Sequence, residues 1–261
     1  MKTATAIAAN RFGLGARPGD LGPINKNPQA WLLNQLEGPS RLPAAIRDLP
    51  SSARVLVEIQ NLRRDQRAMR NPAESEPAPD IVEKYGRTVR RHYIEQANAR
   101  YRNAAQTDYP FHERLVHFWS NHFAVSADKQ PMPAVAGLYE NEAIRPNVTG
   151  NFADLLIACE QHPAMITYLD NQRSIGPNST LGRRASRFRS DRTIGLNENL
   201  AREILELHTL GVDGGYTQDD VTTFAKVITG WSVGGAAENG RFAEGTPGEF
   251  EFREAIHEPV S

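Results

Sequence analysis

The sequence has a single cysteine, almost no net charge and no long apolar run, and each of these excludes a class of protein. With Cys159 alone, the chain forms no internal disulfide and has no cysteine cluster of the kind that holds structural zinc. The formal net charge of −1 provides no overall basic field, so we expect no nucleic acid among the partners. No apolar run approaches the roughly 20 residues that cross a bilayer, and the segment MKTATAIAANRFGLG lacks the apolar core of a signal peptide. We therefore expect no transmembrane segment and a cytoplasmic location.

What the sequence does contain is helical periodicity along most of its 261 residues. Apolar residues recur at intervals of three and four, the spacing of an amphipathic helix, between turn-forming glycines and prolines. We predict an all-α fold, with orthogonal or bundle-like packing of many helices and no substantial sheet, in one domain over 1–261. Stretches rich in proline, glycine or arginine predict flexible segments near 71–79, 172–195 and 232–261.

Cap residues predict where several of these helices begin. Asn27 precedes Pro28, and His162 precedes Pro163, so each pair places a cap before a proline at the first helical position. The segment 217–220 resembles a capping box, with a threonine followed three residues later by an aspartate. We therefore predict helices that begin at 28, 163 and 218.

The most informative stretch runs from 196 to 231, and its pattern predicts two amphipathic helices joined by a glycine-rich turn. Leu200, Ile204 and Leu207 form an apolar stripe along the first helix. We expect this stripe to face the core. The opposite side has three charged residues at four-residue spacing, Glu198, Arg202 and Glu206. This spacing favours ion pairs between them. His208 is the exception, because its angle on the helix places an imidazole on the apolar side. It lies roughly 160° from Glu206, so these two cannot chelate one metal ion.

A second histidine is expected in an apolar setting on the helix predicted over 111–126. Phe111, Leu115, Phe118 and Trp119 cluster on one face of that helix, with His122 among them. His117 points to the opposite, polar side, with Glu113. Two interpretations of His122 remain open. It is a core histidine bonded to a carbonyl or carboxylate, or it forms an interior polar site together with His208.

The segment 172–193 is rich in arginine, and we interpret it as a mobile, solvated loop. The alternative is a loop that becomes ordered over an anionic ligand or a partner. The arginines that would make this contact are Arg183, Arg184, Arg187 and Arg189.

Several long motifs resemble one bacterial family. They are RFGLGARPGD, RLVHFWSNHFAVS, HPAMITYLDN and GLNENLAREILELHTLGVDGGYTQDDV, in this order. The sequence is similar to the family named domain of unknown function 1800 from Arg11 onward. The resemblance implies no established activity. Members of that family usually continue beyond the equivalent of residue 261, so we expect an N-terminal portion. They are often encoded beside a second family whose members resemble exported sulfatases, which implies a possible protein partner.

Two functions from different classes follow from these observations. The one that we favour is a binding protein that acts with a partner, docked by the arginine-rich segment and the polar face of 197–206. The alternative is an enzyme, or a metal- or ligand-binding protein, with an interior polar site formed by His122, His162, Asn197, Glu198, Arg202, Glu203 and His208. In that case His122 and His208 are the candidate metal ligands. The sequence contains no motif that identifies a catalytic residue or a cofactor, so whether the protein is an enzyme stays open.

Overall fold

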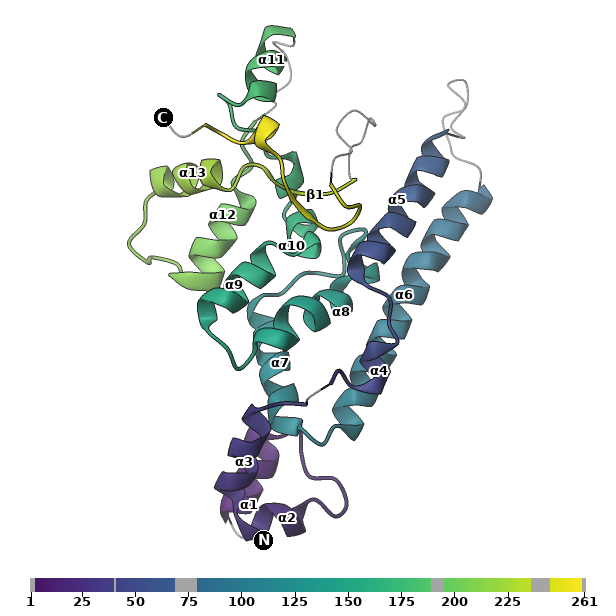
Figure 1. The fold of residues 1–261 in the computed structure, drawn as a ribbon, viewed down its shortest axis with the longest axis vertical. Helices are drawn as coiled ribbons and strands as arrows, with labels where there is room; N and C mark the ends of the chain where they lie inside the picture. The colour runs from purple at the N-terminus through teal and green to yellow at the C-terminus, as the bar shows by residue number, and fades with distance from the viewer. Residues whose placement is uncertain (1–2, 40, 69–78, 189–194, 236–244, 260–261) are drawn as a thin grey trace.

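The computed structural model describes residues 3–39, 41–68, 79–188, 195–235 and 245–259, and it is built almost entirely of helices (Figure 1). The predicted all-α fold is confirmed. Within these residues, the only sheet is a pair of short antiparallel strands. None of the described helices has both the length and the apolar character needed to cross a membrane.

The N-terminal helices form a group with a small core of its own. They are α1 (Thr3–Ile7), the π-helical η1 (Ala8–Phe12), α2 (Leu21–Lys26) and α3 (Pro28–Leu36). Ala8, Ala9 and Ile24 are buried there against Trp31 and Leu32. The predicted start of α3 is confirmed, because the side chain of Asn27 accepts a hydrogen bond from the N–H of Ala30.

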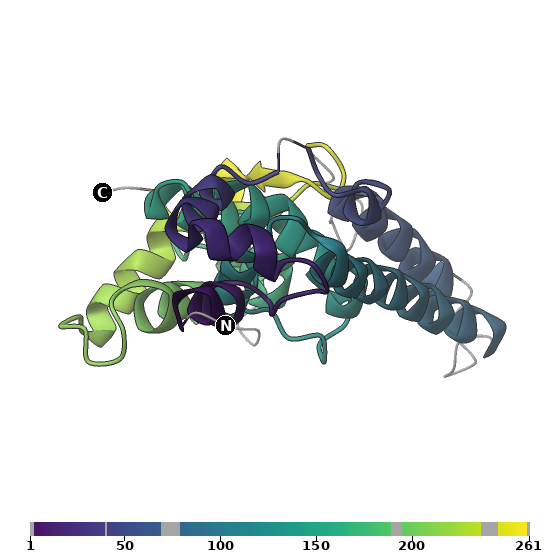
Figure 2. The ribbon, with the colours of Figure 1, turned by 90° about the horizontal axis from the view of Figure 1, so that it is seen from below.

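A long helical hairpin projects from the middle of the molecule. After the short α4 (Ala44–Arg47), the chain forms α5 (Ser52–Ala68) and α6 (Pro79–Gln106), which pack against each other. Both views place this hairpin on the opposite side of the central helices from α12 and α13 (Figures 1 and 2). The base of the hairpin contributes Val55, Ile59 and Val89 to the main core.

The main core lies among the central helices. These elements are α7 (Pro110–His122), η2 (Met132–Ala134), α8 (Ala136–Tyr139), the π-helical η3 (Glu140–Ile144), η4 (Arg145–Asn147), α9 (Phe152–Glu160), α10 (Pro163–Tyr168) and η5 (Asn171–Arg173). Large apolar side chains from most of them are fully buried, among them Phe123, Met132, Leu138, Ile144, Leu155 and Met165. Cys159 is also buried, and burial raises the pKa of its thiol to about 12. This thiol is therefore inert near neutral pH.

The C-terminal third adds a second layer of helices and the small sheet. Its elements are α11 (Thr180–Phe188), α12 (Asn199–Glu203), the π-helical η6 (Ile204–Thr209), α13 (Gln218–Val227), β1 (Trp231–Val233), β2 (Phe250–Phe252) and η7 (Glu254–Ile256). In the sheet, Ser232 pairs with Glu251. The predicted capping box is confirmed at the start of α13.

Regular structure occupies part of two segments that we expected to be flexible. The segment 172–195 contains α11. The segment 232–261 contains β2, η7 and all of β1 except its first residue. The loop predicted for the arginine-rich segment is therefore wrong over Thr180–Phe188, where Arg183, Arg184 and Arg187 lie on a helix. The remaining segment that we expected to be flexible, 71–79, lies outside the described residues except for its last residue.

Candidate functional site

The fold brings His122 and His208 together, although they are 86 residues apart in sequence. His122 is the last residue of α7 and His208 lies in η6, and the centroids of their rings are 6.1 Å apart. Nε2 of His122 lies 3.1 Å from the backbone oxygen of His208. A carbonyl oxygen only accepts hydrogen bonds, so Nε2 of His122 carries a proton and donates it to this oxygen. This approach keeps open a shared site, one of the two interpretations from the sequence.

A buried carboxylate completes this pair of histidines. Glu160 is the last residue of α9, and its Oε1 lies 2.7 Å from Nδ1 of His208. The side chains of Glu160 and His208 are only 2% and 4% exposed. The approach is within hydrogen-bond distance but lacks hydrogen-bond direction, so among the described residues neither carboxylate oxygen has an aligned donor. We define Glu160, His208 and His122 as the α9–η6 cluster.

Burial raises the pKa of Glu160, and the opposing effect of His208 is weaker. The carboxylate of Glu203 adds to that rise, and His122 lowers the pKa slightly. An anionic carboxylate here would have two imidazoles and a second carboxylate near it, and among the described residues no arginine or lysine forms an ion pair with it. The cluster therefore needs a proton or another cation to be stable.

The local sequence positions His208 through a widened helical turn. With regular α-helical spacing, we expected Leu207 to face the core, but Leu207 is 56% exposed. From Ile204 the chain adopts π-helical turns, which contain more residues per turn than an α-helix. In these turns the side chain of Leu207 faces solvent, and the buried residues are Ile204 and His208.

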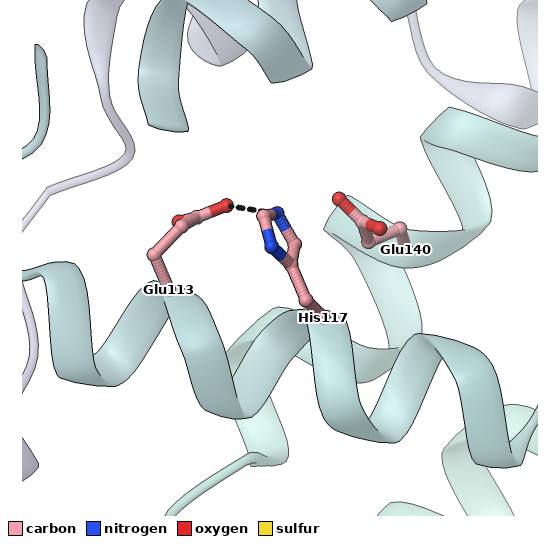
Figure 3. A group of neighbouring side chains, drawn as sticks. All are labelled: Glu113, His117 and Glu140. Carbon is pink, nitrogen blue, oxygen red and sulfur yellow. Dashed lines mark ion pairs between the residues drawn. The ribbon is translucent and has the colours of Figure 1, made fainter. Parts of the chain in front are cut away.

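A second buried cluster lies at the other end of α7 (Figure 3). Glu113 and His117 are one turn apart on α7, and Glu140 faces them from η3. One ligand-type atom from each of the three lies within 4.8 Å of the others. Glu113 and Glu140 are buried, whereas His117 is partly exposed. We define these residues, with Arg145 and Arg100, as the α7–η3 cluster.

Two arginines neutralise the two carboxylates of the α7–η3 cluster. Arg145 donates to both oxygens of Glu113, from Nη1 at 2.5 Å and from Nη2 at 2.9 Å. Arg100 donates from Nε to both oxygens of Glu140. Burial alone would raise the pKa of Glu113, but the bonds from Arg145 outweigh it and hold that pKa at about 2. The net charge of this cluster is therefore close to zero when His117 is neutral.

Glu113 and His117 lie together on the polar side of α7, as we predicted, but this side is buried at Glu113, which is 1% exposed. Phe118, which we had placed with the core, is exposed. A charged face can be buried when charges of opposite sign meet it, and Arg145 lies in a segment 32 residues away. The four-residue spacing of Glu113 and His117 was the signal for this pair, and the sequence gives no indication of the arginines that bury it.

His162 belongs to a third arrangement and does not complete the predicted histidine site. Its Nδ1 accepts a hydrogen bond from the N–H of Ala164, which confirms the predicted cap of α10. Its Nε2 lies 2.9 Å from Oε2 of Glu142, and the hydroxyl of Ser52 donates to the same oxygen. Since Nδ1 is occupied as an acceptor, Nε2 carries the proton and cannot take one from Ser52. The arrangement is a pair of helix caps, without the geometry of an activated nucleophile.

The polar face of 197–206 joins α12 to its neighbours. The guanidinium of Arg202 lies 3.2 Å from oxygens of both Glu198 and Glu206, as the spacing predicted. Gln218 and Thr222 of α13 donate to Glu198. Asn197 donates to the backbone oxygens of Leu169 and Asp170. Glu203, also on this face, raises the pKa of Glu160 in the α9–η6 cluster.

The arginine-rich segment forms a basic surface on α11. Arg183, Arg184 and Arg187 are exposed, and Arg189 lies outside the described residues. No acidic residue occurs between Thr180 and Phe188, and no described carboxylate forms an ion pair with the three exposed arginines. These guanidinium groups therefore face solvent.

Comparison with known proteins identifies the family and nothing more specific. No curated protein sequence and no solved structure is detectably similar to this chain. One family matches residues 7–261, which is nearly the whole chain, and its description is "Protein of unknown function (DUF1800)". The resemblance of the sequence motifs is thereby confirmed, and the chain belongs to this family.

Proposed function

We propose that the protein is a binding protein that docks an acidic protein partner through α11. The supporting observation is that this helix presents three exposed arginines and no acidic residue. Guanidinium groups suit such a surface because each can form paired hydrogen bonds with a carboxylate. The polar face of α12 contributes less, because its charges are already bound within the protein.

The base of α11 is anchored, so the arginines are presented on a fixed support. The carboxylate of Glu258 accepts hydrogen bonds from the backbone N–H and the side chain of Asn178, just before the helix begins. The amide of Gly176 donates to the backbone oxygen of Ile256. α11 stands at the edge of the molecule, beyond the core helices (Figure 1). This arrangement reduces the conformational entropy that docking would cost.

A defined acidic polypeptide tests the proposal. We would titrate fluorescently labelled poly-L-glutamate with the full chain and with the triple variant Arg183→Gln/Arg184→Gln/Arg187→Gln. The variant should bind about tenfold more weakly or worse, and binding of the wild type should weaken as salt is added. The matched control is Lys84→Gln/Arg90→Gln/Arg102→Gln, which removes three exposed charges from α6 instead. Equal losses in both triple variants would show a general charge effect and would contradict docking through α11.

The identity and location of the partner are part of the same proposal. The exported, sulfatase-like proteins encoded beside family members are the candidates that we would test first. Our expectation of a cytoplasmic location for this chain conflicts with an exported partner unless the two meet before export. Fractionation of cells that express both proteins would show whether they share a compartment.

A further inference from the structure

The chain between η6 and α13 exposes apolar side chains close together. We call residues 207–219, from the end of η6 through the start of α13, the η6–α13 turn. Leu207, Leu210 and Val212 are 56%, 56% and 70% exposed. A single exposed apolar side chain is ordinary, but three so close in sequence form a patch of the kind that contacts another protein.

Hydrogen bonds at both ends hold the η6–α13 turn in place. At its start, the N–H groups of Leu210 and Gly211 both donate to the backbone oxygen of Leu205. At its end, the side chain of Gln218 accepts a hydrogen bond from Arg202 of α12. The apolar patch is therefore presented on a fixed support, which reduces the conformational entropy that docking would cost.

The charge of the η6–α13 turn is negative. Asp213 and Asp219 are exposed, and no described arginine or lysine forms an ion pair with either of them. The turn contains no arginine or lysine, and its one histidine, His208, is buried. A partner of this surface needs positive charge together with apolar atoms. The surface of α11 offers the opposite charge, since it has exposed arginines and no acidic residue.

We propose that the η6–α13 turn of one copy of this chain docks α11 of a second copy. The inference rests on the docking role proposed for α11 and names a second copy as its acidic partner. Arg183, Arg184 and Arg187 fall within roughly 100° of one another around the axis of α11, so they share one side of it. Their guanidinium groups bond the carboxylates of the turn, and their methylene stems cover its apolar patch.

The docking surfaces lie at different points on the periphery of the molecule. In Figure 1, α11 is at the top and the η6–α13 turn is at the left, below α13. A contact between two different surfaces leaves one α11 and one turn free on every pair of copies, so further copies can add. Association should therefore produce species larger than a dimer as the concentration rises.

Sedimentation velocity of the full chain tests the proposal. The mass of the wild type should rise above the 29.0 kDa of one copy as its concentration approaches about 1 mM, and added salt should reverse this. One variant reverses the charge of α11, Arg183→Glu/Arg184→Glu/Arg187→Glu, and a second reverses that of the turn, Val212→Lys/Asp219→Lys. Each alone should associate at least about tenfold more weakly than the wild type. An equal mixture of the two should assemble again, because each reversed surface then meets its complement.

The choice of variants separates loss of charge from loss of fold. Lys84→Glu/Arg90→Glu/Arg102→Glu is the matched control, since it reverses three exposed charges on α6, and it should associate as the wild type does. Asp213 stays unchanged, because its φ of 64° lies in the left-handed region, where a lysine would be strained. Circular dichroism of each variant checks that it is folded.

The outcomes distinguish self-docking from the function proposed above. A wild type that remains a monomer at every concentration would overturn self-docking, and if it still binds poly-L-glutamate through α11, the proposed docking role stands with another protein as partner. If it binds neither, both proposals are wrong. Assembly that persists in both reversed variants would also overturn self-docking, because the contact would then lie elsewhere. So would a mixture of the two variants that stays monomeric.

Discussion

The two histidine–carboxylate clusters that contact α7 are both buried, and they differ in how their negative charge is balanced. In the α7–η3 cluster, Glu113 and Glu140 each receive two hydrogen bonds from a guanidinium group. In the α9–η6 cluster, Glu160 has an imidazole at 2.7 Å and no aligned donor. Both carboxylates of the first cluster are therefore paired with arginines, whereas the carboxylate of the second has only an imidazole beside it.

The difference separates a cluster that links parts of the fold through paired charges from one whose carboxylate lacks an aligned donor among the described residues. Arg145 connects η4 to α7 across the interior, and Arg100 connects α6 to η3, so the first cluster fixes how three parts of the fold meet. A buried carboxylate without an aligned donor, such as Glu160, is costly instead. Each cluster contains one residue from a π-helical turn, Glu140 in η3 and His208 in η6. Such turns are frequent at functional sites.

The largest effect is expected from breaking the complete cluster at Arg145. Arg145→Ala leaves the carboxylate of Glu113 buried without its main partner, and we expect a loss of about 3–5 kcal/mol in the free energy of unfolding. Urea denaturation followed by circular dichroism measures this loss. The double variant Glu113→Leu/Arg145→Met is the control, since two apolar side chains remove both charges and should recover much of the stability. A double variant as unstable as the single one would show that the ion pair is not what makes Arg145 important.

The ion pair of Glu113 with Arg145 is also expected to make the free energy of unfolding depend on pH. Its pKa is about 2 in the folded protein and near 4.5 when unperturbed, so the folded state favours the charged carboxylate. The resulting stability, roughly 3 kcal/mol for such a difference, is complete above pH 5 and is lost as the pH falls toward 2. Unfolding free energies measured between pH 7 and pH 3 should therefore fall more steeply in the wild type than in Glu113→Leu/Arg145→Met. Parallel curves would contradict the low pKa of Glu113.

Much of the fold could be predicted from the sequence, because caps and periodicity act locally. Asn27, His162 and the box at Thr217 each bind a backbone group two or three residues away, so their role is visible in a short stretch of chain. The ion pairs of Arg202 follow the same rule, since both partners lie one turn away on the same helix. These predictions are confirmed for this reason.

The clusters could be predicted only in part, since they depend on contacts between distant segments. The pairing of His122 with His208 was inferred from two imidazoles on apolar helix faces, and the structure brings their rings to 6.1 Å. Glu160 was not identified, because a glutamate at the end of a helix normally faces solvent. Arg145 was not identified as the partner of Glu113, because an arginine also normally faces solvent. Leu207 is exposed, contrary to its predicted place in the core, because the helix has π-helical turns from Ile204 onward.

The smallest loss is expected from neutralising Glu160 at pH 7. Glu160→Gln keeps the shape of the side chain and removes a charge that burial disfavours and that has no aligned donor among the described residues, so the free energy of unfolding should fall by less than about 0.5 kcal/mol, if at all. Glu113→Gln is the matched comparison, and it should lose several times more because it leaves Arg145 charged, buried and without its main anionic partner. Equal losses in the two glutamine variants would show that Glu160 and His208 already form a strong ion pair, and the difference between the clusters would disappear.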